Sequence, residues 1–171
     1  MPTFTKFYIE SFEGVALYDY DETIRDLIYK VKGCGDIELR ETFLERYINI
    51  FKIKYKDYYL VPAPSYYEDD NKRGFNHVIE IYRCLGLEPL YIFEKIDDYK
   101  QAGSNVQNRQ NIGEHIKTKN INLYGKKILI VDDVYTTGST IRFMIKQLRK
   151  MNPKTIKILV VAKTKRKVVA N

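Results

Sequence analysis

Cysteine and long apolar runs are scarce in this chain of 171 residues, and their scarcity excludes several classes of protein. Cys34 and Cys84 are the two cysteines, and their wide separation matches no usual zinc or redox spacing, so we expect free thiols in a reducing compartment. No run of about eighteen apolar residues occurs, which predicts no membrane-spanning helix. The first residues lack the apolar region of a signal peptide, so we expect a cytoplasmic protein rather than a secreted one.

Acidic residues are also scarce, but only in the second part of the chain. From residue 116 onward, 14 Lys or Arg accompany only Asp132 and Asp133, whereas the first 115 residues carry 15 basic and 20 acidic side chains. A basic half suits a phosphate-rich ligand. Within it, the run from Lys163 to Lys167 is either a nucleic-acid patch or an ordinary solvated basic tail.

Those two acids belong to the most informative segment of the chain, residues 128–140. Four branched apolar residues end in Asp132 and Asp133, and a short loop then leads into a predicted helix at 139–151. Unpaired amides and the positive dipole end at a helix N-terminus favour an anion, and Gly138 lets the backbone approach it closely. The segment predicts a phosphate-binding loop whose candidate residues are Val134, Tyr135, Thr136, Thr137, Gly138, Ser139 and Thr140.

The paired carboxylates need hydrogen-bond donors, because two acids beside an anion repel it. The 2′,3′-diol of a ribose supplies two such donors, and Mg2+ is a further group that Asp132 and Asp133 can hold. A sugar phosphate therefore satisfies both halves of the segment. The alternative is a strand end with solvated acids, followed by an ordinary capped helix.

Hydrophobic periodicity elsewhere predicts alternating helices and strands. Helices are expected at 22–32, 38–51, 74–85, 106–117 and 139–151, and strands at 59–61, 90–93, 127–131 and 156–161. Nearly all-apolar strands between helices predict a parallel sheet covered on both faces. Ligands of such sheets bind at the carboxyl ends of the strands, where the acidic segment lies.

Residues 128–140 resemble the phosphoribosyl pyrophosphate (PRPP) signature of the type I phosphoribosyltransferases. Further matching segments, in order from about residue 18 to residue 162, narrow the resemblance to the ComF family of competence-associated proteins. They are Tyr18 with 24–32, 60–64 with 73–76, and 100–103 with 109–111. The resemblance implies an α/β type I phosphoribosyltransferase fold: a Rossmann-like central parallel sheet flanked by helices, with a small hood.

The expected organisation is a single domain over 1–171. We expect an N-terminal helical or hood region at about 1–55, a PRPP-binding core at about 56–162 and a basic tail at 163–171. ComF proteins commonly carry an N-terminal four-cysteine zinc module. Two cysteines cannot build such a module, so we expect it to be absent.

The resemblance also implies a second phosphate loop. Backbone groups of Ala63, Pro64 and Ser65 are implied to contact the diphosphate of PRPP, and the Arg73 guanidinium matches phosphate geometry as a nearby anchor. The alternative for this segment is an ordinary proline-stiffened turn.

A third loop, residues 97–109, is expected to be a mobile flap that closes over the ligand. The resemblance implies a basic residue in it, for which Lys100 and Arg109 are the candidates, and Gln101 and Asn111 are possible hydrogen-bonding supports. Lys100, Arg109, Asp132 and Asp133 form the predicted catalytic set. Mg2+ is expected to arrive with PRPP, without a metal site made by protein alone. The alternative is a solvated connection.

The acceptor of a phosphoribosyl group is not specified by any segment. Purine-salvage relatives carry an acid at the position of Thr136, so its presence weighs against hypoxanthine or guanine. His77 and His115 both fall in predicted helices, where structural roles are commoner than catalytic ones.

Three hypotheses follow. The chain is an active Mg2+-dependent phosphoribosyltransferase, or it binds PRPP or a nucleotide without turnover. A third hypothesis, compatible with either, is a DNA-uptake accessory factor that contacts single-stranded DNA or a helicase. The resemblance also makes a homodimer a candidate assembly.

Overall fold

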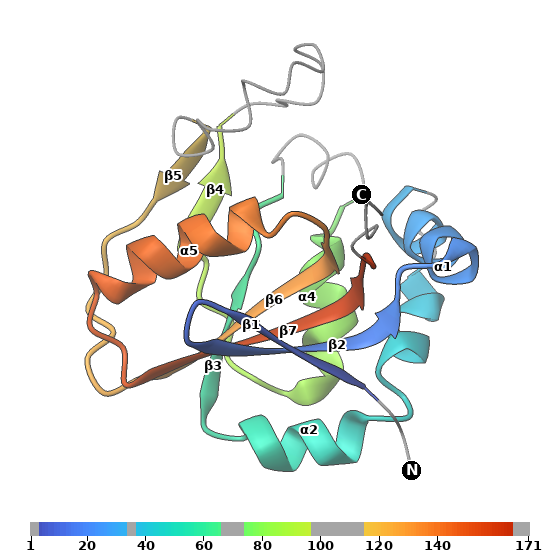
Figure 1. The fold of residues 1–171 in the computed structure, drawn as a ribbon, viewed down its shortest axis with the longest axis horizontal. Helices are drawn as coiled ribbons and strands as arrows, with labels where there is room; N and C mark the ends of the chain where they lie inside the picture. The colour runs from blue at the N-terminus through green and yellow to red at the C-terminus, as the bar shows by residue number, and fades with distance from the viewer. Residues whose placement is uncertain (1–3, 34–36, 66–73, 97–114, 166–171) are drawn as a thin grey trace, which may run out of the picture.

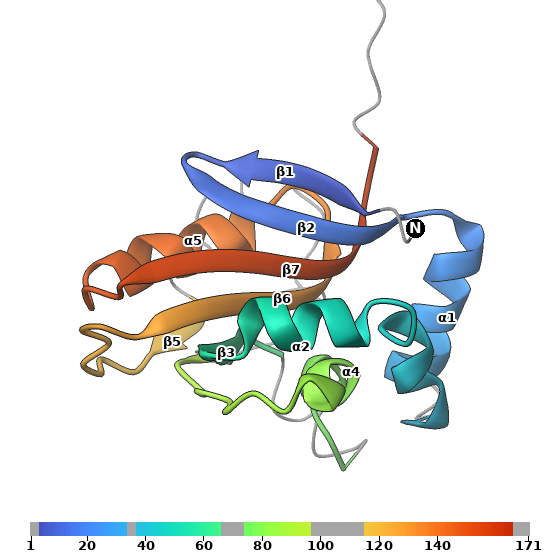
Figure 2. The same cartoon turned by 90° about the horizontal axis from the view of Figure 1, so that it is seen from below.

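The computed structural model describes residues 4–33, 37–65, 74–96 and 115–165. At its centre lies a five-stranded sheet with the strand order β1-β2-β7-β6-β3 (Figures 1 and 2). Its strands are β1 (Thr5–Ile9), β2 (Phe12–Asp19), β3 (Tyr58–Pro62), β6 (Lys127–Tyr135) and β7 (Thr155–Lys163). The last four are parallel to one another in the order β2-β7-β6-β3, and β1 pairs antiparallel with β2 at one edge.

Helices cover both faces of this sheet. Figure 1 shows α5 (Ser139–Arg149) above the sheet and α2 (Ile48–Tyr55) below it. On the α2 side lie α1 (Glu22–Gly33), α4 (His77–Tyr82) and two 3₁₀ helices, η1 (Ile37–Phe43) and η2 (Arg83–Leu85). A separate antiparallel pair, β4 (Phe93–Lys95) and β5 (Ile116–Thr118), shares the α5 side of the core. The α/β fold and the flanked parallel strands are therefore confirmed, within a sheet that is mixed at its edge.

The core consists of two apolar clusters, one on each face, because side chains alternate along each strand. In β6, Ile128 and Ile130 pack on the α5 side, and Leu129 and Val131 pack on the opposite side. The alternation places Asp133 on the same face as α4. Because both faces of β6 are buried, its apolar residues form an uninterrupted run in the sequence.

The N-terminal region departs from its prediction. Residues 5–19 were expected in a helical or hood region, but they form β1 and β2 of the central sheet. Phe7 and Ile9 alternate with exposed residues in β1, and the apolar centre of β2 is buried against β7. Both strands therefore carry strand signals that the prediction missed.

Three further elements differ from their predictions. The helix expected at 38–51 is instead η1 followed by α2, with a turn between them, and the helix expected at 74–85 begins at His77 and ends as η2. The strand expected at 90–93 lies at Phe93–Lys95.

The helix expected at 106–117 is also wrong within the described residues, because Ile116–Thr118 pairs with β4 as a strand. Residues 106–114 lie outside the described part of the chain. The other predicted elements are confirmed, with β6 running on through the two acids to Tyr135.

Candidate functional site

The two predicted ligand loops meet at the carboxyl ends of neighbouring strands. β3 and β6 are parallel partners, and the Ala63 amide just after β3 donates to the Val131 carbonyl of β6 at 2.8 Å. The loop after β6 is also tied to the end of β7, since the Thr164 amide donates to the Tyr135 carbonyl at 3.1 Å. The segments 63–65 and 132–140 therefore lie side by side at the carboxyl ends of β3 and β6.

The Asp133 carboxylate is held from inside the protein. Its Oδ2 lies 3.2 Å from His77 Nε2 and 3.5 Å from Lys32 Nζ. Its Oδ1 accepts a 2.6 Å hydrogen bond from the Val134 amide. Asp132 uses Oδ1 to accept from the Asp133 amide at 2.9 Å. The side chain of Asp133 is only 13% exposed, so these contacts act in a partly desolvated setting.

The two neighbouring acids have opposite pKa shifts. Burial, and then the negative charge of Asp133, raise the pKa of Asp132 well above its ordinary value. Burial also acts to raise the pKa of Asp133, but the His77 hydrogen bond and the charge of Lys32 outweigh it and hold that pKa below its ordinary value. The surroundings of Asp133 therefore favour its charged form, whereas those of Asp132 disfavour the charged form.

Tyr82 fixes the backbone at this point. Its hydroxyl lies 2.9 Å from the Asp132 carbonyl and 3.1 Å from the Leu159 carbonyl of β7, so one donor links α4 to both strands. The side chain is fully buried, and that burial, followed by the charge of Asp132, raises the pKa of its hydroxyl. Tyr82 therefore fixes the backbone at the end of β6 from the α4 side of the sheet.

The loop after β6 requires glycine at position 138. Gly138 has a φ of +74°, and a Cβ there would lie 2.5 Å from atoms of the Tyr135 ring. As N-cap of α5 it offers no side-chain hydrogen bond to the first turn. The Ser139 amide donates to Thr137 Oγ1 at 3.4 Å, and the start of α5 suits an anion as a further partner.

Hydroxyl groups surround the same turn. Thr137 Oγ1 lies 2.9 Å from Ser139 Oγ and 3.4 Å from the Ser139 amide, and the Arg142 guanidinium donates to the Thr137 carbonyl. Thr136 is exposed and Thr140 is half-buried. The hydroxyls of Thr137 and Ser139 therefore lie at this turn, and the binding role predicted for residues 136–140 stays a prediction.

Two of the predicted loop residues have side chains that pack inward. The Tyr135 ring is buried against Phe7, with ring centroids 4.8 Å apart. Val134 packs against the cluster on the α4 side. Backbone groups of these two residues are thus what a ligand at the loop would meet.

The second loop is tied to the start of α4. Ala63 and Pro64 are buried and Ser65 is half-buried. Asn76 donates from Nδ2 to Ser65 Oγ at 2.6 Å, and its Oδ1 caps α4 by accepting from the Ile79 amide at 3.0 Å. A cavity of about 240 Å³ opens beside this loop, lined by Pro62, Ala63, Pro64, Ser65, Asn76, Tyr91, Phe93, Glu94 and Lys119.

Several predicted site residues lie outside the described part of the chain: Arg73, Lys100, Gln101, Arg109 and Asn111. The described residues on either side of 97–114 lie close together. The Ile96 amide donates to the His115 carbonyl at 3.0 Å, directly beyond the β4–β5 pairing.

Three residues of the candidate site were not predicted: His77, Lys32 and Tyr82. Asn76 carries a recognisable N-cap signal, and it would have placed His77 at the first position of a helix. The contact of His77 with Asp133 spans 56 residues of sequence, and that of Lys32 spans 101, so neither can be read from local spacing.

No group of three or more His, Cys, Asp or Glu side chains within residues 4–33, 37–65, 74–96 and 115–165 is arranged to hold a metal ion. Within the same ranges, none of the helices has the length and apolar character needed to cross a bilayer.

Comparison with known proteins identifies relatives of this arrangement. The model of the phosphoribosyl transferase domain family matches residues 81–170. Competence protein ComFC of Streptococcus pneumoniae is 32% identical over 142 residues, which cover 83% of this chain and 64% of that protein. ComFC of Bacillus subtilis is 28% identical over 130 residues, covering 75% and 54%. The chain thus spans between about half and two thirds of the length of these curated relatives.

Solved structures resemble the chain more distantly. A purine phosphoribosyltransferase from Pyrococcus horikoshii is 21% identical, covers 71% of this chain and 73% of its own, and has a TM-score of 0.44. A hypoxanthine phosphoribosyltransferase from Staphylococcus aureus is 11% identical, covers 79% and 68%, and has a TM-score of 0.49. At these identities the likeness concerns the fold alone.

Proposed function

The chain belongs to the phosphoribosyl transferase domain family, and from that membership we propose that it binds PRPP at the carboxyl ends of β3 and β6. The observation that carries the proposal is the junction of β6 with α5. There, a buried strand ends in two adjacent acids, and a loop containing Gly138 leads at once into α5. The proposal assigns a phosphate site and a diol site to this one short segment.

The parts of PRPP match the groups around this junction. The 5-phosphate suits the amides and hydroxyls of residues 136–140, where a Cβ at Gly138 would intrude. The ribose diol suits the acid pair, because carboxylate oxygens accept the hydrogen bonds that the two hydroxyls donate. The diphosphate suits the backbone of residues 63–65, with Arg73 as an anchor.

Mg2+ fits the same site, because carboxylate and phosphate oxygens are the ligands that it prefers. Asp132 and Asp133 are the residues that would help to hold it, and bound there it would neutralise charge on the diphosphate. Lys100 or Arg109 would add positive charge to the same group. The chain's own contribution is to orient the ribose and to fix the phosphate.

Two outcomes of PRPP binding are distinct. In transfer, an acceptor displaces pyrophosphate at the anomeric carbon, and the cations stabilise the departing negative charge. In regulation, PRPP or a nucleotide is bound without turnover. Pyrophosphate release from PRPP across a panel of nitrogen bases separates the two, because binding without any release rejects the enzyme.

Calorimetric titration with PRPP and Mg2+ tests the proposal. We expect the unaltered chain to bind, and the double substitution Asp132→Ala/Asp133→Ala to weaken binding by about a hundredfold or more, because hydrogen bonds to charged groups are the strong ones. Asp57→Ala is the matched control: this exposed acid lies before β3, at the opposite end of the strand, and pairs with Lys127. Equal binding by the double variant and the unaltered chain would reject the proposal.

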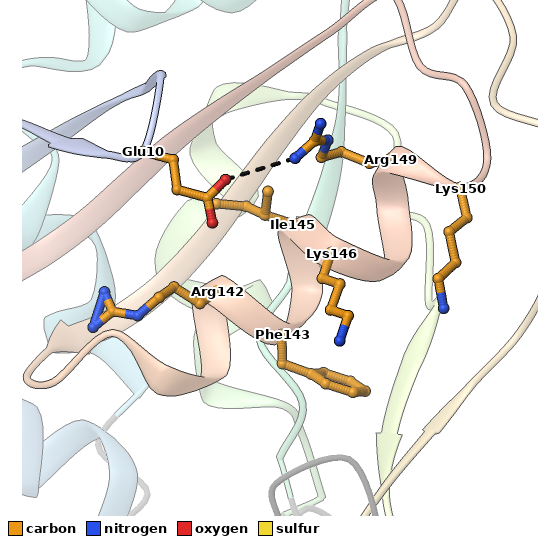
Figure 3. A pocket seen from close by; sticks show the side chains of 7 residues that line it. All are labelled: Glu10, Arg142, Phe143, Ile145, Lys146, Arg149 and Lys150. Carbon is orange, nitrogen blue, oxygen red and sulfur yellow. Dashed lines mark ion pairs between the residues drawn. The ribbon is translucent and has the colours of Figure 1, made fainter. Parts of the chain in front are cut away.

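A second candidate function concerns an anionic strand. The outer side of α5 borders a hollow of about 680 Å³ whose lining includes Arg142, Lys146, Arg149 and Lys150 (Figure 3). One acid lines it, Glu10, which pairs with Arg149 at 3.7 Å. The curated relatives are named as competence proteins. We propose single-stranded DNA as a partner of this face, in keeping with a role in DNA uptake.

The described part of the basic tail is a weaker candidate for the same strand. Lys163 is half-buried with its ammonium over the Phe7 ring, and Lys165 pairs with Asp19 at 3.1 Å. Residues 166–171 lie outside the described ranges. A DNA-uptake helicase, a homodimer and a cytoplasmic location are further proposals, and they rest on the resemblance to ComF proteins.

Fluorescence anisotropy with a labelled single-stranded oligonucleotide tests the α5 face. We expect affinity to fall steeply with salt, with a log–log slope of about −0.7 for each neutralised phosphate. Lys146→Glu/Arg149→Glu should abolish most of that slope, whereas Lys52→Glu/Lys56→Glu, at α2 and its C-cap, should leave it unchanged. A flat salt response of the unaltered chain, or equal loss in both double variants, would remove the α5 face as the DNA surface.

A further inference from the structure

We infer that His77 is the positioning residue that orients Asp133 toward the ribose hydroxyls. The inference rests on the proposed function, and it assigns to a buried histidine a role in selecting the sugar. No local motif marks His77 for such a role, because its partner lies 56 residues away on another element.

The contact is directional and protected from water. His77 is 4% exposed, and its Nε2 lies 3.2 Å from Asp133 Oδ2. The other carboxylate oxygen is held by the Val134 amide at 2.6 Å. Because each carboxylate oxygen has a hydrogen-bond partner, the plane of the carboxylate is fixed. Its orientation is therefore set before a ligand binds.

The unpaired nitrogen of His77 strengthens the assignment. Its Nδ1 is buried without a hydrogen-bond partner among the residues that the structure describes. An apolar side chain would fill this space without leaving a buried polar atom unsatisfied. Among the described residues, the contact of Nε2 with Asp133 is therefore what accounts for an imidazole at this position.

The helix that carries His77 is anchored at several points. Asn76 caps it and contacts Ser65 of the second loop, and the Tyr82 hydroxyl contacts the Asp132 carbonyl. Glu80, which is 5% exposed, pairs with Arg40 at 2.8 Å and with Arg83. A ring on so constrained a helix can transmit a fixed direction to the carboxylate that it touches.

Lys32 contacts the same oxygen but is less suited to set its direction. Its ammonium lies 3.5 Å from Asp133 Oδ2, and its side chain is 39% exposed on a flexible stem. Lys32 supplies charge to the pair, and the His77 ring supplies geometry. Loss of the Lys32 charge and loss of the His77 ring should therefore have different effects on the choice between sugar phosphates.

The test compares ribose 5-phosphate with 2-deoxyribose 5-phosphate, which lacks one hydroxyl of the diol. We expect the unaltered chain to prefer ribose 5-phosphate by about tenfold, the effect of one hydrogen bond to a charged group. His77→Phe keeps a ring without a donor and should reduce this preference to about twofold or less by the same reasoning. His77→Gln restores a donor at similar reach and should recover most of the preference.

A merely structural histidine would give another result. Its loss would weaken both sugar phosphates alike and leave their ratio unchanged, which would overturn the inference. Should His77→Phe fail to fold, His77→Asn, whose shorter side chain cannot span the contact, replaces it with the same expected loss of preference. If the unaltered chain binds neither PRPP nor ribose 5-phosphate, the proposed function fails and the inference fails with it.

Discussion

At the scale of single residues, the site depends on two adjacent acids that their surroundings make different. His77 and Lys32 contact the carboxylate of Asp133, whereas Asp132 is half-buried beside it and accepts a hydrogen bond from the Asp133 amide. A vicinal diol, in which each hydroxyl can donate a hydrogen bond, suits two adjacent acids whose oxygens accept.

Gly138 provides a prediction at this scale. Gly138→Ala forces a Cβ into the left-handed region at φ +74°, 2.5 Å from the Tyr135 ring. The backbone conformation alone costs about 1–2 kcal/mol, and the clash adds to it. We expect a melting temperature lowered by more than about 4 °C and a clear loss of PRPP affinity.

Gly125→Ala is the matched control, because Gly125 has the same φ of +74° but open space where a Cβ would lie. It should show the conformational cost alone and leave PRPP binding unchanged. Differential scanning calorimetry and ligand titration compare the two variants. Equal destabilisation and equal binding in both would contradict the role assigned to the loop.

At the scale of elements, the sequence predicted what local pattern determines. The apolar run before Asp132 identified β6, and the spacing of Ile141, Met144, Ile145 and Leu148 identified α5, since all four are buried. β1 and β2 were missed because the short alternation of β1 and the short apolar centre of β2 were not recognised as strand signals. Their place in the sheet depends on the pairing of β1 with β2 and of β2 with β7. Long-range pairing of this kind is not encoded in local spacing.

The candidate site likewise contains residues that local sequence predicts and residues that only tertiary contacts bring together. The residues of the loop after β6 could be predicted because they are contiguous and their chemistry is local. His77 could not be assigned, because its partner is on another element and becomes adjacent only when α4 packs below β6. Helix 106–117 was expected where Ile116–Thr118 is a strand, because the pairing with β4 is decided by tertiary contact.

Glu13 provides a prediction at the scale of elements, because it joins β2 to β7 and α2. Its carboxylate lies 3.0 Å from Lys157 Nζ and 3.3 Å from Lys54 Nζ. The hydrogen bond from Lys157, the largest effect, lowers the pKa of Glu13, and Lys54 lowers it further, against the opposing effect of burial. The folded-state pKa therefore lies below the unfolded one.

A lowered carboxyl pKa stabilises the fold above the unfolded value, near 4.5, and this contribution is lost as pH falls through the folded value. Glu13→Gln should reduce the free energy of unfolding by up to about 1 kcal/mol at pH 7 and by less at pH 3. Urea unfolding at both pH values measures the difference. Glu10→Gln, whose side chain is 56% exposed with its partner 3.7 Å away, is the control and should change little. A Glu13→Gln effect that does not depend on pH would contradict this assignment.

At the scale of the whole molecule, the two faces of the sheet contribute different parts of the candidate site. The α4 side holds the acids in place through His77 and Tyr82, and the α5 side supplies a helix start at Gly138. Both sides meet at the carboxyl ends of β3 and β6, where parallel pairing brings residues 63–65 beside Asp132. The basic outer surface of α5 begins at the same loop, because Arg142 contacts the Thr137 carbonyl.

A crystal structure of the chain with PRPP and Mg2+ tests the central claim most directly. We predict that the 5-phosphate lies within hydrogen-bond distance of backbone amides in residues 137–140, and that Asp132 and Asp133 contact the ribose hydroxyls. PRPP bound with its phosphate away from this loop and its hydroxyls away from both acids would contradict the account.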